Sequence, residues 1–292
     1  MKTLLDVKVM VNGLPGKMAK IIAQGIFDLP NVLPMNATSF SLLDLALTGP
    51  NQPKKISEFK NMTLFGPEDH EKVLAEASNL PAYVCAIDAC KGAGVANRNA
   101  EMYCRHHIPF VMLSTTDVDY KLIEKLAEET MTPCVACPNM DVRIVAWMAG
   151  IQHMAENYLG AFENSKIFLT ETHQADKVNA DGKPETSGTM NKALKNLSAL
   201  LGEELTADQI ISMRDPNVQA KIIGVPKNWL GWHAYHFFKV SNEHDGVEDS
   251  EELIFKRHGG ECYRRGTMLA LDFLAKEKNE KYFNTMIDVI KG

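Results

Sequence analysis

The sequence predicts an α/β protein with a doubly wound parallel sheet, followed by a second region of different character. Three observations support this prediction. A glycine-rich turn joins a strand to a helix near residue 13, apolar strand segments then alternate with helical ones, and the pattern changes after Pro138. Strands that alternate with helices are typical of parallel sheets, because the crossover helices cover the sheet faces.

The first strand–turn–helix unit is the clearest element. Val7, Val9 and Val11 alternate along a strand, and apolar residues then recur at helical spacing from Met18 until Pro30 ends the helix. A second strand is expected at residues 31–35. Further strands are expected at 83–87 and 109–113, and helices at 68–77, 93–106 and 120–129.

The region after Pro138 is expected to mix helices with antiparallel strands. A long amphipathic helix over 143–158 leads to a strand at 166–170, a polar segment and a helix at 190–201. Later strands are expected at 219–225, 233–240 and 252–257. The chain is expected to end with helices at 267–276 and 281–291.

Composition excludes several classes of protein. The chain has 292 residues, which favours two domains, and its 45 % hydrophobic and 23 % charged residues are ordinary for a globular protein. The net charge of −6 comes from interspersed charges without a basic stripe, so no nucleic-acid partner is expected. No apolar run approaches the roughly 20 residues of a membrane span, so no membrane association is expected.

The cysteines predict a reducing compartment. Six are scattered along the chain, unlike the dense pattern of a disulfide-stapled secreted domain. The first residues run directly into a strand pattern, which leaves no room for a targeting segment. The chain is therefore expected to be cytoplasmic.

The glycine loop is the first candidate site. Gly13-x-x-Gly16-x-x-Ala19 follows a strand and opens a helix, so its backbone amides can approach a pyrophosphate. Ala19, in place of a third glycine, still permits close packing. The alternative is that the glycines serve only a tight turn. The position of the loop favours a nicotinamide dinucleotide, and a Walker A loop is excluded because no Gly-Lys-Ser/Thr ends it.

The end of the second strand bears on the choice of cofactor. Asn36, Thr38 and Ser39 are expected there, and no carboxylate follows until Asp44. Neutral polar groups accommodate a 2′-phosphate, which favours NADPH over NADH. A surface loop without contact to the cofactor is the alternative.

Ser114-Thr115-Thr116-Asp117 follows the strand at 109–113. Ligands bind at the carboxyl ends of strands in open α/β sheets, so these hydroxyls are candidates to face the nicotinamide. Alternatively, Asp117 or Asp119 caps the next helix, and both roles are compatible.

The most informative stretch begins at Glu171-Thr172-His173-Gln174-Ala175-Asp176-Lys177. A histidine and a lysine four residues apart suit the donation of a proton beside an anionic substrate. Ser187-Gly188-Thr189, directly before a helix, offers hydroxyls and unpaired amides for a carboxylate. The alternatives are a surface histidine and an ordinary N-cap at Ser187.

Other candidates are weaker. Cys134-x-x-Cys137 lies on an expected strand without a second ligand pair, so structural cysteines are favoured and no metal site is predicted. His233 and His236 lie in an aromatic strand and are interpreted as packing residues.

Short motifs that resemble those of one known family extend over nearly the whole chain. They include Val11-Asn12-Gly13, Gly16-Lys17-Met18, Phe65-Gly66-Pro67, Glu171-x-His173-Gln174-Ala175-x-Lys177, Ser187-Gly188-Thr189, Arg214-Asp215-Pro216, His233-Ala234-x-His236 and Met286-Ile287-Asp288-Val289. With them the chain resembles the dihydrodipicolinate reductase (4-hydroxy-tetrahydrodipicolinate reductase) family, and specifically its plant-type branch.

The resemblance implies a Rossmann-like dinucleotide-binding domain at residues 1–138 and 264–292. It implies an α+β substrate-binding and tetramerisation domain at 139–263, with an open mixed sheet. The implied reaction is the NADPH- or NADH-dependent reduction of a cyclic imine dicarboxylate in lysine and diaminopimelate biosynthesis, by a homotetramer.

The resemblance also implies roles for particular residues. His173 would be the proton donor or orienting acid, and Lys177 would supply a second acidic proton and attract the substrate. The substrate would be bound by Ser187, Gly188, Thr189 and Gln174. The cofactor would be bound by Asn12, Gly13, Gly16, Lys17, Met18, Thr38, Ser39, Asp88, Ser114, Thr115, Thr116 and Asn139.

The chain also departs from the family pattern. The family's Gly-Thr-Thr-Gly is replaced by residues 114–117, its Asp-Phe/Tyr-Thr-x-Pro by 88–91, and residues 179–186 are extra. Three hypotheses therefore remain open: the family reductase, a relative with a changed substrate, and a binding or assembly protein without catalysis. Retention of His173, Lys177 and Ser187-Gly188-Thr189 argues against the third.

Overall fold

The structure is a computed structural model that describes residues 5–28, 38–115, 117–162, 164–175, 177–178, 181–222, 233–244, 247–276 and 281–291. It divides into two compact units, Met1–Val142 with Tyr263–Gly292, and Arg143–Cys262. Within these described ranges, no helix is both long and apolar enough to cross a membrane.

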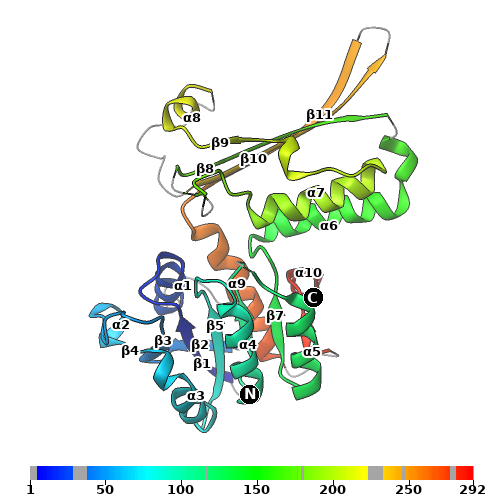
Figure 1. Ribbon diagram of the computed structural model, residues 1–292. Helices are drawn as coiled ribbons and strands as arrows, with labels where there is room; N and C mark the ends of the chain where they lie inside the picture. The colour runs from blue at the N-terminus through cyan, green and yellow to red at the C-terminus, as the bar shows by residue number, and fades with distance from the viewer. Residues whose placement is uncertain are drawn as a thin grey trace. The chain divides into compact units, whose positions relative to one another are not determined.

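The first unit is built on a parallel sheet of six strands in the order β12-β7-β6-β5-β1-β2 (Figure 1). The strands are β1 (Leu5–Asn12), β2 (Thr38–Leu42), β5 (Tyr83–Asp88), β6 (Phe110–Met112), β7 (Cys134–Ala136) and β12 (Phe283–Asn284). A separate parallel pair, β3 (Leu45–Leu47) and β4 (Thr63–Phe65), follows β2. The chain leaves β1 in opposite directions towards β2 and β5, so the predicted Rossmann-like, doubly wound sheet is confirmed.

Helices connect these strands. They are α1 (Lys17–Phe27), α2 (Glu58–Asn61), the short 3₁₀ helix η2 (Pro67–Asp69), α3 (His70–Ser78), α4 (Val95–Arg105), α5 (Tyr120–Thr130), α9 (Glu261–Ala275) and α10 (Met286–Lys291). Asp119 caps α5 by accepting hydrogen bonds from the amides of Lys121 and Leu122, as one of the two sequence alternatives proposed. The hydroxyl of Tyr83 on β5 donates to the Leu274 carbonyl, which ties α9 to the sheet.

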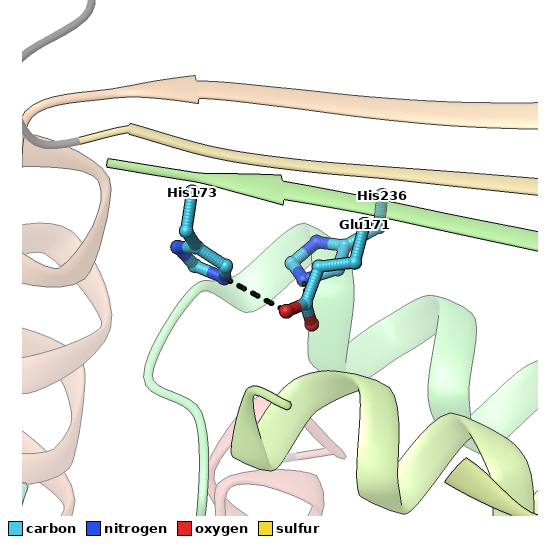
Figure 2. Close-up of side chains that lie close together, drawn as sticks. All are labelled: Glu171, His173 and His236. Atoms are coloured by element: carbon cyan, nitrogen blue, oxygen red, sulfur yellow. Dashed lines mark ion pairs between the residues drawn. The ribbon is translucent and has the colours of Figure 1, made fainter. Parts of the chain in front are cut away.

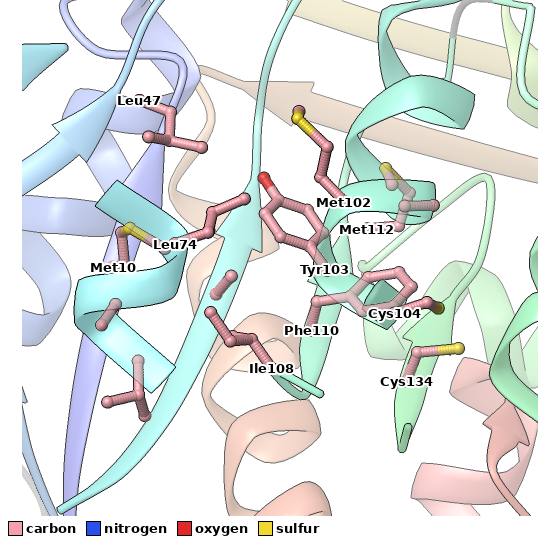
Figure 3. Packing of buried hydrophobic residues seen from close by; sticks show 14 of the residues in the cluster. Met10, Leu47, Leu74, Met102, Tyr103, Cys104, Ile108, Phe110, Met112 and Cys134 are labelled. Carbon is pink, nitrogen blue, oxygen red and sulfur yellow. The ribbon is translucent and has the colours of Figure 1, made fainter. Parts of the chain in front are cut away.

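The core of the first unit lies where α3, α4 and α5 pack on the sheet (Figure 3). Tyr103 of α4 and Phe110 of β6 are fully buried, with ring centroids 5.3 Å apart. Strands β6 and β7 are buried at every position. Parallel strands that are covered on both faces have such continuous apolar runs, which explains why the sequence located them well.

The second unit contains a sheet in the order β11-β10-β8-β9. Its strands are β8 (Lys166–His173), β9 (Ile210–Met213), β10 (His233–His244) and β11 (Val247–His258). Strands β8 and β9 pair in parallel and the other pairs are antiparallel, so the predicted mixed sheet is confirmed.

Two long helices, α6 (Val142–Asn157) and α7 (Gly188–Leu201), cover one face of this sheet (Figure 1). Leu169 of β8 and Phe238 of β10 pack with Leu194 and Leu197 of α7 in the core. Because side chains alternate along a strand, Glu171 and His173 project to the same face as Leu169. The described residues of this unit also form the short helices η3 (Leu159–Phe162), η4 (Ala207–Gln209) and α8 (Pro216–Ile222).

The strand expected at 219–225 is wrong, because residues 216–222 form α8. Pro216 begins this helix, and the Asp215 carboxylate accepts a hydrogen bond from the Asn217 amide. A proline at the first helical position and a preceding aspartate are start signals that the apolar pattern concealed. Residues 223–225 lie outside the described residues.

The strand that pairs with β1 lies further along the chain than the segment expected for it. Residues 31–35 lie outside the described residues, and the strand that pairs with β1 is Thr38–Leu42. Likewise, residues 281–291 begin with β12, which pairs with β7, and the helix starts only at Met286. Two-residue edge strands carry no periodicity that a sequence reading can detect.

Gly266 on α9 is expected to be essential for the first unit. A Cβ atom there would lie 1.8 Å from the Met140 carbonyl oxygen, so helix or loop would have to shift. We expect Gly266→Ala to lower the free energy of unfolding by about 3 kcal/mol or more, measured by denaturant titration.

Gly150 on α6 is the matched control, because a Cβ atom there meets nothing within 4 Å. Gly150→Ala should raise stability by about 0.5 to 1 kcal/mol through helix propensity. A Gly266→Ala protein as stable as the wild type would contradict this packing.

Candidate functional site

The glycine loop at the end of β1 forms a close turn. Gly13 has a φ of 96°, and a Cβ atom there would lie 2.6 Å from the Ala89 carbonyl oxygen. A Cβ atom on Gly16 would lie 2.7 Å from the Gly13 carbonyl oxygen. Both positions therefore require glycine. Helix α1 begins directly afterwards with Lys17, which is exposed, and Met18, which is half-buried, so its first-turn amides can receive an anion.

A cavity of about 540 Å³ opens beside this loop, at the carboxyl ends of β1 and β5. This is the point at which the strand order reverses, where open α/β sheets bind their ligands. Three basic residues line the cavity: His70 at the start of α3, Lys91 after β5 and Arg98 on α4. These three residues are far apart along the chain, so no local sequence pattern predicts that they come together.

Three of the expected cofactor-binding side chains are bonded within the protein. Asp88 is fully buried, and its carboxylate accepts hydrogen bonds from Ser114 (2.6 Å), Asn99 (2.6 Å), Tyr103 (2.9 Å) and the Cys90 amide (3.1 Å). Burial and the Asp88 charge raise the pKa of Tyr103, which stays a neutral donor.

Asn12 belongs to the same network. Its side chain donates to the Tyr103 hydroxyl at 2.8 Å and accepts from the Leu47 amide at 2.8 Å. Asn12, Asp88 and Ser114 therefore lock the ends of β1, β5 and β6 together. Hydrogen bonds from backbone amides to Asn12 and Asp88 fix the loops that line the cavity.

The other expected cofactor residues differ in position. Thr115 is exposed, Thr116 lies outside the described residues, and Asn139 accepts a hydrogen bond from the Asp141 amide in a turn before α6.

Thr38 and Ser39 require a correction, since they lie at the start of β2 and not at its end. Thr38 pairs with Leu5 and Ser39 with Asp6, whereas the glycine loop follows the opposite end of β1, about 20 Å away. The exposed carboxylate of Asp44 follows the end of β2 instead.

A buried carboxylate, Glu171, organises a second site in the second unit. His236 lies directly across from Glu171 in the register of β8 and β10, and His173 follows two residues along β8. Figure 2 shows the three side chains projecting to the same side of the sheet. Glu171 is fully buried, and the two histidines are 6 % and 1 % exposed.

Both oxygens of Glu171 have partners. Arg214 donates to Oε1 at 2.8 Å, and the Ser187 hydroxyl and amide donate to Oε2 at 2.6 and 3.1 Å. The Ser187 hydroxyl donates its one hydrogen bond to Glu171, so in the contact of 3.1 Å with His236 Nε2 the imidazole is the donor. His236, interpreted from the sequence as a packing residue, thus belongs to this polar network, as do Glu171 and Arg214, for which the sequence predicted no role.

Ser187 is thus both the N-cap of α7 and a hydrogen-bond donor to Glu171. Its hydroxyl also accepts a hydrogen bond from the Met190 amide, which caps α7. The Ser187 side-chain oxygen therefore has hydrogen-bond partners in Glu171, His236 and the Met190 amide. The backbone amides of Gly188 and Thr189, at the start of α7, lie beside it at the positive end of the helix dipole.

His173 and Gln174 present polar atoms to the site. His173 Nε2 lies 3.7 Å from Glu171 Oε1, and it makes no hydrogen bond within the described part of the chain (Figure 2). The Gln174 amide oxygen, also buried, likewise has no partner among the described residues. Two buried polar atoms without partners are expected where a ligand completes the bonding.

Lys177 lies at the edge of the site. Its ammonium group is 3.3 Å from a carboxylate oxygen of Glu185, across a turn that a bridge between Val178 and Pro184 closes. Arg214 donates to the carbonyl oxygens of both Lys177 and Glu185, at 3.3 and 2.9 Å. Arg214 therefore joins this turn to Glu171.

The pKa shifts follow from this arrangement. Burial opposes ionisation of Glu171, but hydrogen bonds from His236 and Ser187 and the nearby histidine charges lower its pKa to about 2. Burial lowers the pKa of His173 to about 3; Glu171 opposes this shift, and the positive charges of His236, Lys177 and Arg214 add to it. At neutral pH, His173 is a neutral imidazole beside an ionised carboxylate.

Glu171, His173 and His236 also resemble a metal-ligand set, since their ligand atoms lie within 4.8 Å of one another. Glu171 is already neutralised by Arg214, however, and a divalent cation would add two positive charges beside that guanidinium. Burial of this excess charge is costly. The partners favour an ion-paired carboxylate over a metal centre.

The chain resembles curated reductases over almost its whole length. It is 33 % identical over 289 residues to 4-hydroxy-tetrahydrodipicolinate reductase 2, chloroplastic, of Arabidopsis thaliana, which covers 98 % of this chain and 77 % of that protein. It is 30 % identical over 287 residues to the probable 4-hydroxy-tetrahydrodipicolinate reductase 1, chloroplastic, of Oryza sativa subsp. japonica, with 97 % and 78 % covered. No protein-family model matches the chain.

Two solved structures share the fold. Dipicolinate-bound dihydrodipicolinate reductase from Paenisporosarcina sp. TG-14 has a TM-score of 0.60 at 14 % identity, and covers 99 % of this chain and 100 % of that one. Apo scyllo-inositol dehydrogenase from Lactobacillus casei has a TM-score of 0.54 at 9 % identity, with 100 % and 93 % covered. At these identities the likeness concerns the fold alone.

The lowered pKa values of His173 and Glu171 predict that acid destabilises the second unit. Unfolding lets His173 take up a proton below its ordinary pKa of 6.5, so stability falls as the pH drops from 6.5 towards about 3. The lowered pKa of Glu171 contributes stability that is fully present above pH 4.5 and is lost as the pH falls towards about 2. The slope from one group is at most about 1.4 kcal/mol per pH unit.

Denaturant titrations at several pH values check this prediction, with His173→Asn as the comparison. The variant should show a shallower loss of stability just below pH 6.5, where His173 alone of the two groups contributes. Parallel curves for the two proteins would mean that His173 is not held neutral.

Proposed function

Because this chain belongs to the 4-hydroxy-tetrahydrodipicolinate reductase family, we propose that it reduces 4-hydroxy-tetrahydrodipicolinate, a cyclic imine dicarboxylate, to tetrahydrodipicolinate. It is an NAD(P)-dependent oxidoreductase, and the proposed role is in lysine and diaminopimelate biosynthesis. The observation that carries the proposal is 33 % identity over 98 % of the chain, together with the site around His173.

The first unit is the proposed dinucleotide-binding domain. The tight turn at Gly13 and Gly16, where a Cβ atom would clash with backbone carbonyl oxygens, and the adjoining cavity fit a dinucleotide, because they leave the loop backbone close to the space for a pyrophosphate. Gly13, Gly16 and the amides of Lys17 and Met18 would hold the pyrophosphate. When bound, the cofactor supplies the hydride.

We propose NADPH as the cofactor. The cavity lining includes Lys91, Arg98 and His70 but not Asp44, and basic side chains favour a 2′-phosphate. A carboxylate at the end of β2 that bound the ribose hydroxyls would favour NADH instead. Asp44 follows β2, but it does not line the cavity. The basic residues replace Thr38 and Ser39 as the proposed selectivity residues.

The second unit is the proposed substrate-binding domain, and the Glu171 cluster is its proposed catalytic site. His173, kept neutral and fixed beside Glu171, would orient the substrate through its unpartnered Nε2 atom. Lys177, with three N–H donors, is then the group that would deliver the proton. Gln174 would complete the polar contacts to the substrate ring.

A substrate carboxylate would lie at the start of α7. The amides of Gly188 and Thr189 and the helix dipole would stabilise it. Ser187 would act indirectly, since its hydroxyl is engaged by Glu171 and α7. This division of roles refines the expectation that all three residues bind the carboxylate directly.

The proposed assembly is a homotetramer through the open face of the mixed sheet. Phe168 on β8, Ile211 on β9 and Ile254 on β11 lie opposite the helix-covered face and are 47, 57 and 49 % exposed. Large exposed apolar residues on neighbouring strands are typical of an interface.

The proposed compartment is the cytoplasm. In the part of the chain that the structure describes, all six cysteines are outside disulfides, as in a reducing environment.

A reductase assay tests the proposal. Supplied with the lysine-pathway precursor, the protein should consume NADPH, measured by the loss of its absorbance. Lys177→Ala should lower kcat by about 100- to 1,000-fold, because a positioned proton donor contributes an effect of this size. Cofactor affinity, measured by calorimetry, should stay nearly unchanged.

Lys195→Ala, an equal change of charge at an exposed position of α7, is the control and should keep its activity. Cofactor binding without turnover by the wild type would favour a changed substrate. An absence of cofactor binding would favour an assembly protein. A large loss of cofactor affinity in Lys177→Ala would contradict the role of Lys177.

The cofactor preference has its own test. Replacing Lys91 and Arg98 together by alanine should raise KM for NADPH by about 10- to 100-fold, as expected for the loss of charge-assisted hydrogen bonds to a phosphate. KM for NADH should change little. Lys72→Ala, at an exposed position of α3, is the control. Equal losses for both cofactors would assign the two residues to the shared pyrophosphate.

A further inference from the structure

Glu185 lies beside Lys177, the residue that is proposed to deliver the proton to a dicarboxylate substrate. The carboxylate oxygen of Glu185 is 3.3 Å from the Lys177 ammonium nitrogen. The turn between them is closed by the bridge between Val178 and Pro184, and by a hydrogen bond from the Glu185 amide to the Lys177 carbonyl. The ion pair is thus built into a local structure, and is not a chance contact of two long side chains.

Arg214 holds both ends of this turn. It donates to the Lys177 and Glu185 carbonyl oxygens and, at 2.8 Å, to the Glu171 carboxylate. Because Arg214 is only 9 % exposed and its partners include a buried charge, the turn is anchored to the site. The backbone at Glu185 cannot move away without breaking these bonds.

The side chain of Glu185, in contrast, is able to swing away. It is 52 % exposed, while Lys177 is 21 % exposed. A partly exposed ion pair is weak, and its carboxylate can rotate into water at little cost. An incoming carboxylate can therefore take the place of Glu185 beside the ammonium group.

We propose that Glu185 is an internal competitor for the substrate carboxylate that approaches Lys177. It occupies this position when the site is empty, and it weakens the binding of dianionic ligands more than that of monoanionic ones. This inference rests on the proposed function, since that function assigns Lys177 to an anionic substrate. Glu185 belongs to the residues 179–186 that are extra relative to the family pattern, so it would tune this chain in particular.

Calorimetry with two probes tests the inference. Pyridine-2,6-dicarboxylate, called dipicolinate, carries two carboxylates, and pyridine-2-carboxylate carries one. Glu185→Gln keeps the backbone bonds to Arg214 and removes the competing charge. It should bind dipicolinate about fivefold more tightly than the wild type, the upper range for a partly exposed ion pair, and should gain less for the monocarboxylate.

Two controls separate a local from a general effect of charge. Glu203→Gln makes the same change in an exposed turn after α7, about 20 Å along the helix from the site, and should leave binding unchanged. In a Lys177→Ala background, Glu185→Gln should lose most of its effect, because the competition requires the ammonium group.

The outcomes distinguish this inference from the proposed function. Turnover by the wild type with no tighter dipicolinate binding by Glu185→Gln would overturn the inference alone. Tighter binding without turnover would support the inference and overturn the proposed reaction. An absence of dipicolinate binding in both proteins would count against both, and an undiminished gain in the Lys177→Ala background would overturn the competition at Lys177.

Discussion

The buried charge of Glu171 is the constraint on which the second unit depends. A carboxylate without solvent access is stable only if donors replace the lost water, and loss of one partner from such a pair costs about 3 to 5 kcal/mol. Its partners come from three separate segments: Arg214 after β9, Ser187 before α7, and His236 on β10, whose Nε2 atom donates to Ser187 and lies 3.5 Å from Oε2 of Glu171. The hydrogen bonds to this one carboxylate hold the ends of β8 and β9, the start of α7 and the turn between Lys177 and Glu185 close together.

The first unit also contains a buried carboxylate, Asp88, whose hydrogen-bond donors come from separate segments. Its carboxylate joins the ends of β5 and β6 to α4 through Ser114, Asn99 and Tyr103. Three side chains that a motif suggests as cofactor ligands, those of Asn12, Asp88 and Ser114, are thus bonded within the protein, and the proposed contacts to the cofactor phosphates are left to backbone amides and to the basic residues of the cavity. In both units a buried polar network shapes the site without being its contact surface, because a satisfied network gives the backbone one arrangement.

This division explains how the proposed chemistry could work with few catalytic groups. An ionised Glu171 and a neutral His173 side by side are two titratable groups whose environments drive their protonation states apart. His173 lies between Glu171, 3.7 Å away, and the ring of His236, whose centroid is 5.7 Å from its own. Lys177 lies at the edge of the site and is paired with Glu185 at 3.3 Å. The charge that is proposed to meet the substrate is therefore balanced by a partly exposed ion pair and not by the buried network around Glu171.

The sequence by itself determined the alternation of strands and helices, the glycine loop, the family motifs and the stretch from His173 to Ser187, because these depend on local periodicity and on residues close in the chain. The tertiary structure alone decided the partners of Glu171, the cavity lining of His70, Lys91 and Arg98, and the position of Thr38 and Ser39 at the start of β2. Helix α8 is the exception, because its start signals, Asp215 and Pro216, are local and stand in the sequence. Burial, register and charge pairing join residues dozens of positions apart, and no local pattern encodes them.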